Sequence, residues 1–312
     1  MHDGTGVLIT GGSGFVGRAV ARVLPRARAL ASRDLDLTDG AAVASRIAEW
    51  RPEVVLHLAA RVGGITANIA LQADFLIDNL RIDANLMAAL RAHPPRHFIP
   101  MLSTCMYPDR LADSYYPLDE TRVEDGPPPP TNAAYAAAKR ALWYGARALY
   151  AQYGVPYTAL IPANLYGPGD HYGSDNSHFL AAAITKIEAA RRSGAPSVSF
   201  MGTGRALRQY LLVDDLARLV QEVVAGPAHN ATFNVAPSAC HTIADLTRAV
   251  ADASAYSGEI LFTGAGPDGQ YRKDVTCERL RSAVPAWSRI ETPLIEGIEQ
   301  TLTWYRTHVA PR

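Results

Sequence analysis

Short apolar runs alternate with longer segments of helical periodicity along the first half of the chain. Four runs of mainly apolar residues have the length of strands buried on both faces: 7–10, 54–60, 97–103 and 155–161. A weaker strand is expected at 29–31, and helical patterns fill the intervals at 15–24, 40–50, 75–92 and 133–153. Strands that alternate with helices predict an α/β fold in which helices cover both faces of a parallel sheet.

Proline and glycine mark the two ends of the helix expected at 133–153. Four consecutive prolines occupy residues 127–130, and such a run cannot belong to a helix interior or to a central strand. Thr131 or Asn132 can cap the helix that follows, and Gly154 is placed to end it. We therefore expect a stiff segment that leads into one long helix.

The composition excludes several functional classes. The 312 residues include 30 basic and 30 acidic ones, which gives a formal net charge of zero. Because there is no overall positive field, nucleic acid and membrane surfaces are excluded as main partners. The start of the chain lacks the features of a signal peptide, and no apolar run suits a membrane span. The three cysteines cannot all pair and lack the spacing of a metal site, so we expect a cytoplasmic protein without a metal.

Lysine is rare in this chain, and the position of one lysine indicates a candidate catalytic pair. Only three of the 30 basic residues are lysine: Lys139, Lys186 and Lys273. Lys139 follows Tyr135 by four residues, so both side chains lie on one face of the expected helix. A nearby ammonium favours the phenolate, so we expect the pKa of Tyr135 to be lowered toward neutrality. The pair is a candidate general acid/base. The alternative is a surface tyrosine that lies against a lysine side chain.

A glycine-rich loop follows the first expected strand and opens a helix. Gly12, Gly14 and Gly17 fit the pattern G-x-G-x-x-G, and Gly11 starts the related pattern G-x-x-G-x-x-G. Such glycines let the backbone approach a pyrophosphate at a helix N-terminus, where free amides and the helix dipole favour negative charge. The loop therefore predicts a dinucleotide site, with these cofactor-binding residues: Gly11, Ser13, Gly14, Phe15, Val16 and Gly17.

The residues after the second expected strand bear on the choice of cofactor. Arg33, with Ser32 and Ser13, can bind the 2′-phosphate of NADP, whereas Asp34 is the type of residue that holds the ribose 2′-hydroxyl of NAD. This segment alone leaves both cofactors open, and we predict NADP (NADPH). Its candidate contacts here are Arg33, Asp36 and Leu37.

These motifs together resemble the extended short-chain dehydrogenase/reductase family. The resemblance rests on residues 10–17 and 57–60, on Ser103, and on Tyr135 with Lys139. Within that family the chain is similar to the GDP-L-fucose synthase group. Several short motifs spread over nearly the whole chain carry this narrower likeness: 57–65, 103–108, 164–168, 176–178, 267–269, 272–273, and Gly297 with 304–305.

The resemblance implies a fold and an assembly. The fold would be a Rossmann-type doubly wound parallel sheet with a smaller, discontinuous C-terminal substrate domain. The NADP-binding Rossmann domain would comprise residues 1–165 and 206–234, and the nucleotide-sugar substrate domain residues 166–205 and 235–312. We also expect a homodimer in which the two long helices of each subunit pair across a two-fold axis as a four-helix bundle.

The same resemblance implies an enzyme of nucleotide-sugar biosynthesis that is both an oxidoreductase and an isomerase. Its substrate would be GDP-4-keto-6-deoxy-D-mannose, which is epimerised at C3 and C5 and then reduced at C4 by NADPH to GDP-L-fucose. Cys105 and His178 would act as base and acid, since both titrate near physiological pH. Ser103 and Tyr135 would hydrogen-bond the keto oxygen. Tyr135 would finally protonate that oxygen, while Lys139 holds the nicotinamide ribose.

The remaining binding residues are also implied by the resemblance. Around the cofactor we expect a further set of contacts: Ala59, Ala60, Tyr135, Lys139, Asn164 and Leu165. Around the GDP-sugar we expect a second set: Asn164, Lys186, Met201, Arg208, Asp268, Arg272 and Lys273.

The chain departs from the family pattern around the expected sugar pocket. Met201 replaces a tryptophan, Ala163 replaces a threonine, and Gln209-Tyr210 stands where the family has Glu-Phe. A related GDP-keto-sugar, such as a deoxyheptose, therefore stays open as the substrate. An epimerase without net reduction is a second alternative. A dinucleotide-binding scaffold or sensor is the non-enzyme alternative, and the presence of Tyr135 together with Ser103 argues against it.

Overall fold

The centre of the molecule is a parallel sheet. The computed structural model describes residues 2–173, 177–265 and 270–310. The strands of the sheet are β1 (Val7–Thr10), β2 (Arg28–Leu30), β3 (Val54–His57), β4 (His97–Pro100), β5 (Thr158–Pro162) and β10 (Ala231–Val235). Four of them are hydrogen-bonded in the order β2-β1-β3-β4, and parallel bridges continue the sheet from β4 to β5, which pairs with β10. These pairings are all parallel, as predicted.

The strand order reverses at β1, which creates a place for a ligand. From β1 the chain passes through α1 (Phe15–Val23) to β2 on one side of the sheet. It then returns through α2 (Gly40–Trp50) to β3 on the other side of β1. The connections at the carboxyl ends of β1 and β3 therefore diverge, and open α/β sheets bind ligands at such a switch point. The glycine-rich loop lies here, between β1 and α1.

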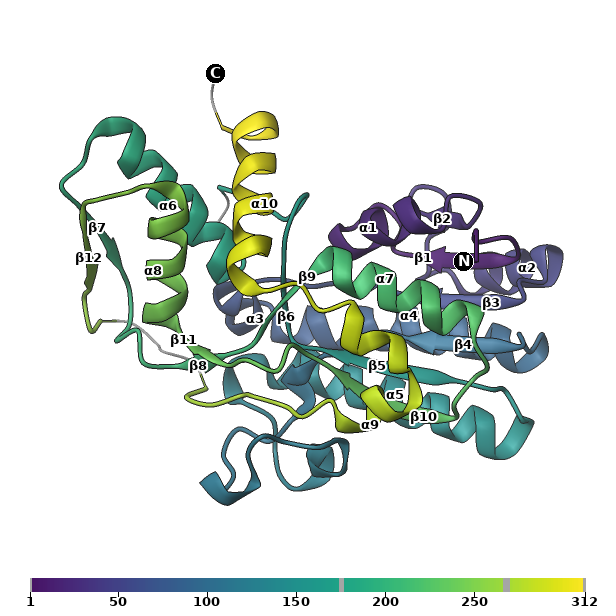
Figure 1. Cartoon of the computed structure of the whole chain (residues 1–312). Helices are drawn as coiled ribbons and strands as arrows, with labels where there is room; N and C mark the ends of the chain where they lie inside the picture. The colour runs from purple at the N-terminus through teal and green to yellow at the C-terminus, as the bar shows by residue number, and fades with distance from the viewer. Residues whose placement is uncertain (1, 174–176, 266–269, 311–312) are drawn as a thin grey trace.

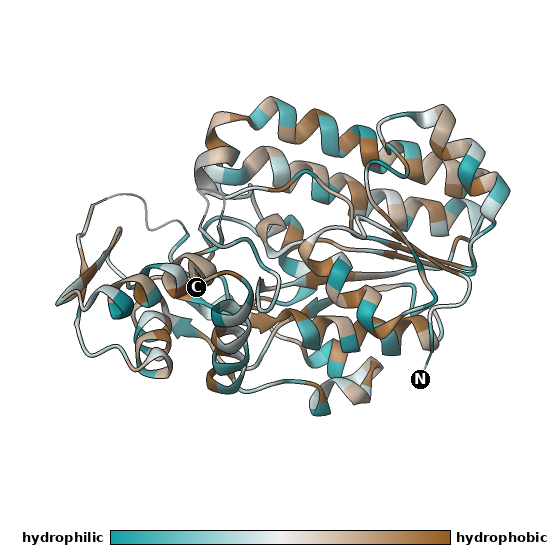
Figure 2. Cartoon of the chain, turned by 90° about the horizontal axis from the view of Figure 1, so that it is seen from above, coloured by the Kyte–Doolittle hydropathy of each residue, from teal (hydrophilic) through white to brown (hydrophobic). Residues whose placement is uncertain are grey.

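Helices cover both faces of the sheet, so the predicted doubly wound α/β fold is confirmed (Figure 2). α1 packs against α7 (Val213–Ala225), whereas α4 (Gln72–Ala92) packs against both α2 and α5 (Ala133–Tyr153). β3 lies between the two helical layers, and its residues Val54, Val55 and Leu56 are completely buried. Among the helices that the structure describes, none is both long and apolar enough to cross a bilayer.

A smaller lobe faces the carboxyl ends of the strands (Figure 1). Its helices are α6 (Phe179–Ser193), α8 (Ile243–Ser254) and α10 (Leu294–His308), and a short helix, α3 (Ile65–Ala70), precedes α4 in the larger lobe. Short strands complete this lobe and its connections: β6 (Asn164–Tyr166), β7 (Ser197–Phe200), β8 (Leu207–Arg208), β9 (Tyr210–Leu212), β11 (His241–Thr242) and β12 (Glu259–Phe262). The lobe has its own hydrophobic core, to which α6, α8 and α10 all contribute. The buried Glu188 carboxylate ties α6 to α10 through Arg306, at 2.6 Å.

The segment after β12 returns to the core of the larger lobe. Val275, Leu280 and Trp287 belong to the same hydrophobic cluster as the central strands, and α9 (Glu278–Ala283) packs against β10. The expected substrate-domain segment 235–312 therefore contributes to both cores, because the chain crosses between the lobes before it forms α10. The division into two domains stays a prediction, and this packing argues for assigning the α9 region to the Rossmann unit.

The predicted helices match the structure more closely than the predicted strands. α2 and α5 have the expected bounds, and Gly154 ends α5 in the left-handed conformation with φ of 69°. Asn132 is at the N-cap position of α5 but makes no side-chain capping hydrogen bond. The runs 54–60 and 97–103 form strands only as far as His57 and Pro100, and the residues after these points line a cavity at the carboxyl ends of the strands.

Candidate active site

A cavity of about 690 Å³ lies at the carboxyl ends of the central strands. Thr10, Leu58, Met101 and Pro162, each at or just beyond the end of a strand, contribute to one wall, and His178 contributes from the smaller lobe. The cavity thus spans the switch point of the sheet and the boundary between the two lobes. All the predicted catalytic residues line it: Ser103, Cys105, Tyr135, Lys139 and His178.

The glycine-rich loop has the backbone geometry of an anion site. Gly11 has a φ of +71°, and a Cβ added there would lie 2.8 Å from the Ala59 backbone. A Cβ on Gly17 would lie 2.2 Å from the Gly11 carbonyl oxygen. The loop therefore excludes side chains and leaves the first turn of α1, which contains no acidic residue, beside the cavity. The predicted residues of this loop all line the cavity: Gly11, Ser13, Gly14, Phe15, Val16 and Gly17. An NADP pyrophosphate fits this arrangement.

Arg33 is the exception among the other predicted cofactor residues. The rest line the same cavity: Asp36, Leu37, Ala59, Ala60, Tyr135, Lys139, Asn164 and Leu165. The Arg33 side chain is 87% exposed, lies outside the cavity lining, and has Asp34 at 3.8 Å. Asp34 accepts a hydrogen bond from the Ala31 amide at 2.8 Å. A contact between Arg33 and a 2′-phosphate therefore stays a prediction.

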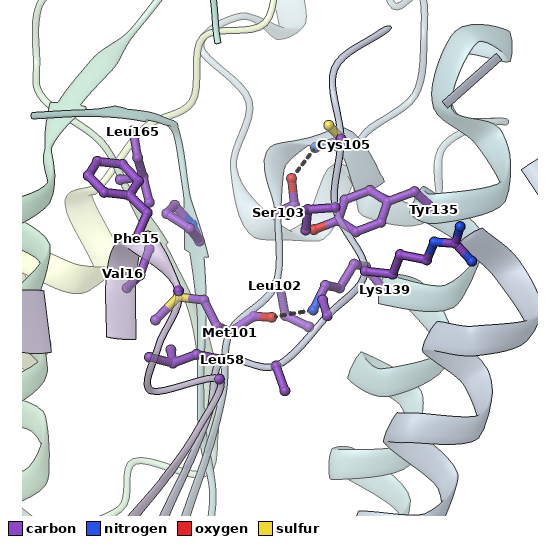
Figure 3. Close-up of a pocket in the computed structure, with 18 of the residues that line it drawn as sticks. Phe15, Val16, Leu58, Met101, Leu102, Ser103, Cys105, Tyr135, Lys139 and Leu165 are labelled. Carbon is purple, nitrogen blue, oxygen red and sulfur yellow. Dashed lines mark hydrogen bonds between the residues drawn. The ribbon is translucent and has the colours of Figure 1, made fainter. Parts of the chain in front are cut away.

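Ser103, Tyr135 and Lys139 converge on the cavity from two elements. Ser103 follows β4, and its hydroxyl accepts a hydrogen bond from the Cys105 amide at 3.2 Å as the chain enters a 3-10 turn, η1 (Thr104–Met106). Tyr135 and Lys139 lie in the first turns of α5. Figure 3 shows the Tyr135 phenol directed toward Ser103, and Lys139 directed toward Met101, whose carbonyl oxygen accepts a hydrogen bond from Nζ at 2.9 Å.

The expectation that the pKa of Tyr135 is lowered proves wrong. Burial raises the pKa of Tyr135, the negative charges of Cys105 and Asp83 raise it further, and a hydrogen bond with Ser103 only partly opposes them. The Lys139 ammonium lies 5.9 Å from the centre of the Tyr135 ring, and it bonds to the Met101 carbonyl. Tyr135 is therefore a protonated phenol, which suits a proton donor better than a base.

Cys105 lies beside a lysine that is far away in the sequence. Lys273 Nζ donates a hydrogen bond to Cys105 Sγ at 3.2 Å, although 168 positions separate the two residues. Burial disfavours the thiolate, but Lys273, the hydrogen bond with Ser103 and the charge of His178 together hold the pKa of Cys105 below its ordinary value. The sequence assigned Lys273 to the GDP-sugar. The structure places it in the cavity lining and against the thiol.

His178 lies next to a buried carboxylate that the sequence analysis missed. Nδ1 of His178 is 3.6 Å from Oδ1 of Asp170, whose side chain is only 1% exposed. The interaction with Asp170 raises the pKa of His178, partial burial of the ring opposes this effect, and the charge of Cys105 adds to it. Asp170 follows a Pro-Gly turn and has no spacing that would have marked it as a partner of His178.

A second buried carboxylate also escaped the sequence analysis. Asp83 Oδ1 lies 2.9 Å from Nε2 of His57, and His57 Nδ1 lies 2.7 Å from the Thr10 hydroxyl. These three side chains link α4, β3 and β1 behind the cavity. The negative charge of Asp83 raises the pKa values of both Tyr135 and Lys139, although burial lowers that of Lys139 overall.

The predicted GDP-sugar residues fall into two groups. Asn164, Arg208 and Lys273 line the cavity, and Asn164 is fixed by a hydrogen bond from its side-chain amide to the Gln209 carbonyl oxygen at 3.2 Å. The others lie outside the lining: Lys186, which is exposed on α6; Met201, which is 75% exposed; and Arg272, which forms a bidentate ion pair with Asp274. Asp268 lies outside the described residues. The roles of these residues stay predictions.

Comparison with known proteins identifies the family. The NAD dependent epimerase/dehydratase family matches residues 7–236. The chain belongs to this family. Within the epimerase/dehydratase family it is similar to GDP-L-fucose synthases. The one from Dictyostelium discoideum is 32% identical over 308 residues, which cover 96% of this chain and 94% of that protein. The one from Escherichia coli K12 is 33% identical over 314 residues, which cover 96% of each.

Solved structures of similar proteins have the same fold. A GDP-L-fucose synthetase from Naegleria fowleri bound to NADP is 29% identical, with a TM-score of 0.84, and covers 96% of this chain and 92% of its own. A GDP-D-glycero-L-gluco-heptose synthase from Campylobacter jejuni has the same TM-score at 23% identity, covering 96% and 98%, which shows a shared fold. The resemblance drawn from the sequence motifs is thus confirmed.

Proposed function

We propose that this protein is an NADP-dependent epimerase/reductase that converts GDP-4-keto-6-deoxy-D-mannose to GDP-L-fucose. The observation that carries the proposal is that one cavity contains two sets of acid/base groups, Cys105 with His178 and Ser103 with Tyr135. A ketone reductase needs only the second set, because reduction requires one proton donor to the oxygen. The GDP-L-fucose synthases among the relatives support the choice of sugar.

The first set of groups suits epimerisation. Protons on the carbons beside a ketone are acidic, so inversion needs a base on one face of the sugar and an acid on the other. Cys105 approaches from the turn after β4, and His178 approaches from the start of α6 in the opposite lobe. Ser103 and Tyr135 would hydrogen-bond the C4 oxygen and stabilise the enolate that forms when the base removes a proton.

The second set suits reduction at C4. NADPH, when bound, supplies the hydride. Its pyrophosphate would lie on the glycine-rich loop, and Asn164 and Leu165 would lie beside its nicotinamide half. Tyr135 donates its proton to the C4 oxygen. Because its pKa is raised, the phenol is protonated before the reaction starts. Lys139, fixed by the Met101 carbonyl, holds the ribose, and Ser103 orients the oxygen.

We also propose a homodimer formed through α4 and α5. The outer face of α4 carries Ile77, 52% exposed, and Leu80, 37% exposed, with the small exposed residue Ala84 one turn further. On the adjacent α5, Tyr144 is 47% exposed, and the small residue Ala148 is exposed one turn beyond it. Apolar and small residues along two neighbouring helices suit pairing with the same surface of a second copy.

A cytoplasmic location is part of the proposal. The three cysteines are all free in the structure. Cys105 in particular must stay reduced to act as a base, which a reducing compartment ensures.

The proposed reaction is tested directly by product analysis. The purified protein is incubated with GDP-4-keto-6-deoxymannose and NADPH in deuterated water, and the product is identified by NMR. We expect GDP-L-fucose with deuterium at C3 and C5, because each inversion passes through an enolate that is reprotonated from an exchanged group. If the protein instead converts a GDP-deoxyheptose ketone, the proposed substrate is wrong and the proposed reaction class stands. If no GDP-keto-sugar supports NADPH oxidation, the protein is not this enzyme, and the dinucleotide-binding scaffold is the alternative that remains.

Cys105→Ala separates the two half-reactions. The variant should lose deuterium exchange at C3 and C5 yet still reduce the unepimerised ketone slowly, because Tyr135, Lys139 and the cofactor site remain. The product would then keep the starting configuration and be a rhamnose-type sugar. Cys240→Ala, a cysteine outside the cavity lining, serves as the matched control. Fully inverted product at the wild-type rate from Cys105→Ala would show that Cys105 is only a packing residue.

A further inference from the structure

Each member of the proposed epimerisation pair lies beside a side chain of opposite charge. Lys273 Nζ is 3.2 Å from Cys105 Sγ, and Asp170 Oδ1 is 3.6 Å from His178 Nδ1. The two companions come from different parts of the chain: Asp170 from the loop after β6, and Lys273 from the segment between β12 and α9. Two independent segments thus each provide the charge that complements one partner of the pair.

We propose that Lys273 and Asp170 are positioning residues that set the charges of the epimerisation pair before substrate binds, with Cys105 as thiolate and His178 as imidazolium. The inference rests on the proposed function for the role of this pair in catalysis. The two charges themselves are measurable without any substrate. Lys273 thereby acts on the thiol, in addition to any contact that it makes with the sugar nucleotide.

The surroundings of Cys105 favour its thiolate, whereas those of the other two cysteines favour the neutral thiol. Burial opposes ionisation, but Lys273, Ser103 and His178 outweigh it and lower the pKa of Cys105. Tyr135, which also faces the thiol, contributes no charge while its pKa is raised by burial. By contrast, burial raises the pKa of Cys240 to about 11 and that of Cys277 to about 12. Cys105 therefore ionises at the lowest pH of the three cysteines.

The surroundings of Asp170 favour a positive charge next to its carboxylate. Its side chain is buried, the His171 amide donates a hydrogen bond to Oδ1 at 2.7 Å, and Oδ2 has no hydrogen-bond partner within the described residues. A buried carboxylate with an unused oxygen is costly unless a cation compensates it. His178 Nδ1, 3.6 Å from Oδ1, can provide this cation, and Cys105 is the other charged group that acts on His178. Because Nδ1 faces Asp170, Nε2 is left to carry a proton to the substrate.

The charges match what one inversion requires. The thiolate of Cys105 removes the proton from carbon, so an S–H bond forms, a C–H bond breaks, and the electron pair moves onto the C4 oxygen. The imidazolium of His178 then gives its Nε2 proton to the opposite face, so an N–H bond breaks and a C–H bond forms. The substrate regains the proton count that it started with. The pair ends as a neutral thiol and a neutral imidazole.

A second inversion requires the pair to be reset. Cys105 must release one proton and His178 must gain one, and exchange with solvent leaves the total unchanged. Lys273 favours the release and Asp170 favours the gain, since each stabilises the charged form of its neighbour. The two positioning residues therefore serve both the first inversion and the recovery between the inversions at C3 and C5.

Thiol labelling tests the role of Lys273 without substrate. The rate of iodoacetamide labelling at Cys105 is followed by peptide mass spectrometry from about pH 5 to about pH 10, because only the thiolate reacts. Wild type should have its midpoint below that of an ordinary thiol. Lys273→Met should raise the midpoint and slow labelling near neutral pH by about tenfold or more, the effect of one charge-assisted hydrogen bond. Lys273→Arg should restore most of the rate. Arg248→Met, which removes an exposed positive charge of α8 outside the cavity lining, should leave the midpoint unchanged.

Histidine NMR tests the role of Asp170. The ring signals of His178, assigned by their loss in His178→Asn, should titrate above the ordinary midpoint of about 6.5 in wild type. Asp170→Asn should lower this midpoint. Deuterium exchange into the sugar, which should decline as rising pH removes the His178 imidazolium, should then decline at a lower pH as well. Asp170→Glu should keep it raised. If Asp170→Asn does not fold, the wild-type titration alone decides, since a midpoint at or below the ordinary value contradicts the proposal.

The outcomes separate this inference from the proposed function. An ordinary Cys105 midpoint, or equal midpoints in wild type and Lys273→Met, would overturn the assignment of Lys273. If both titrations behave as expected but the protein converts no GDP-keto-sugar, the proposed function fails and the charge assignment stands. Retained NADPH binding in each variant, measured by fluorescence, shows that the cofactor domain is still folded.

Discussion

Burial acts on both Tyr135 and Cys105, yet it leaves the two residues in opposite protonation states. For Tyr135 burial dominates, and the pKa of the phenol is raised. For Cys105 the Lys273 ammonium helps to overcome burial, and the pKa of the thiol is lowered. In the proposed mechanism, Tyr135 thus starts as an acid and Cys105 starts as a base. These are the states that reduction and epimerisation respectively require.

Tyr135→Phe should remove the proton donor for reduction. We expect the rate of NADPH oxidation to fall by about two to four orders of magnitude, the usual contribution of a general acid. The measurement is steady-state loss of NADPH absorbance with the keto-sugar. Tyr153→Phe, which changes an exposed tyrosine at the other end of the same helix, should be close to wild type. A near-normal rate in Tyr135→Phe would refute its assignment as proton donor.

Single residues were predictable from the sequence where their partners are local. Tyr135 and Lys139 share one helix face, so their spacing groups them, and Ser103 and Cys105 lie in one short motif on which the family resemblance rests. The contact between Lys273 and Cys105 spans 168 positions, and no local pattern encodes it. The state of Tyr135 was mispredicted for a related reason, because burial and the direction of the Lys139 side chain depend on the whole fold.

At the scale of elements, the residues just beyond the carboxyl ends of the strands line the cavity and are not part of the sheet. The apolar runs 54–60 and 97–103 continue past His57 and Pro100, but Leu58 and Met101 line the cavity rather than extending a long strand. Periodicity cannot separate these cases, because a cavity wall and a strand interior are both apolar. The two-residue strands β8 and β11 were missed because they form through long-range pairing, with each other and, for Leu207 of β8, also with Arg272. Helix α5 was predictable because its pattern and its terminating glycine are local.

The junction of β4 and β5 should make stability depend on pH. His97 is fully buried there, with Nε2 2.8 Å from the Thr158 hydroxyl. Burial, together with Arg96 and His229, lowers the pKa of His97 to about 4. An unfolded chain binds this proton near pH 6.5, so protonation favours unfolding as the pH falls from about 6.5 toward about 4.

We expect His97 to reduce the free energy of unfolding by about 2 kcal/mol between about pH 7.5 and about pH 5. Urea unfolding at the two pH values measures this change. His97→Gln should lose this part of the pH dependence, whatever its effect on stability at neutral pH. His241→Gln, at a partly exposed position, should retain it. Equal pH dependence in wild type and His97→Gln would contradict the prediction.

At the scale of the whole molecule, two hydrophobic cores enclose one cavity from opposite sides. The larger core contains the sheet and the α9 region, and the smaller core contains α6, α8 and α10. Arg18 links the lobes near the cofactor loop, since its guanidinium donates to the Gly169 carbonyl at 2.6 Å. The exposed face of α4 and α5 lies on the larger lobe, so pairing of two copies there would leave the cavity free.

Ile77→Glu should break the proposed dimer. A charge on the apolar face of α4 opposes burial against a second copy. Wild type should sediment at twice the chain mass of 33.6 kDa, and the variant should sediment at the mass of one chain. Ile295→Glu, with 51% exposure compared with 52% for Ile77, is the matched control on the other lobe. A wild type that sediments as a single chain would exclude the dimer.

The scarcity of lysine has a consequence for the reactivity of the molecule. Lys139 and Lys273 line the cavity, which leaves Lys186 as the one side-chain amine outside it. Elsewhere the positive charge is carried by arginine, whose guanidinium stays protonated and is a poor nucleophile. Aldehydes, reducing sugars and acylating metabolites therefore find almost no target on the exterior. Modification of Lys139 or Lys273, compared with that of the exposed Lys186 as an internal standard, would therefore report whether the cavity is occupied.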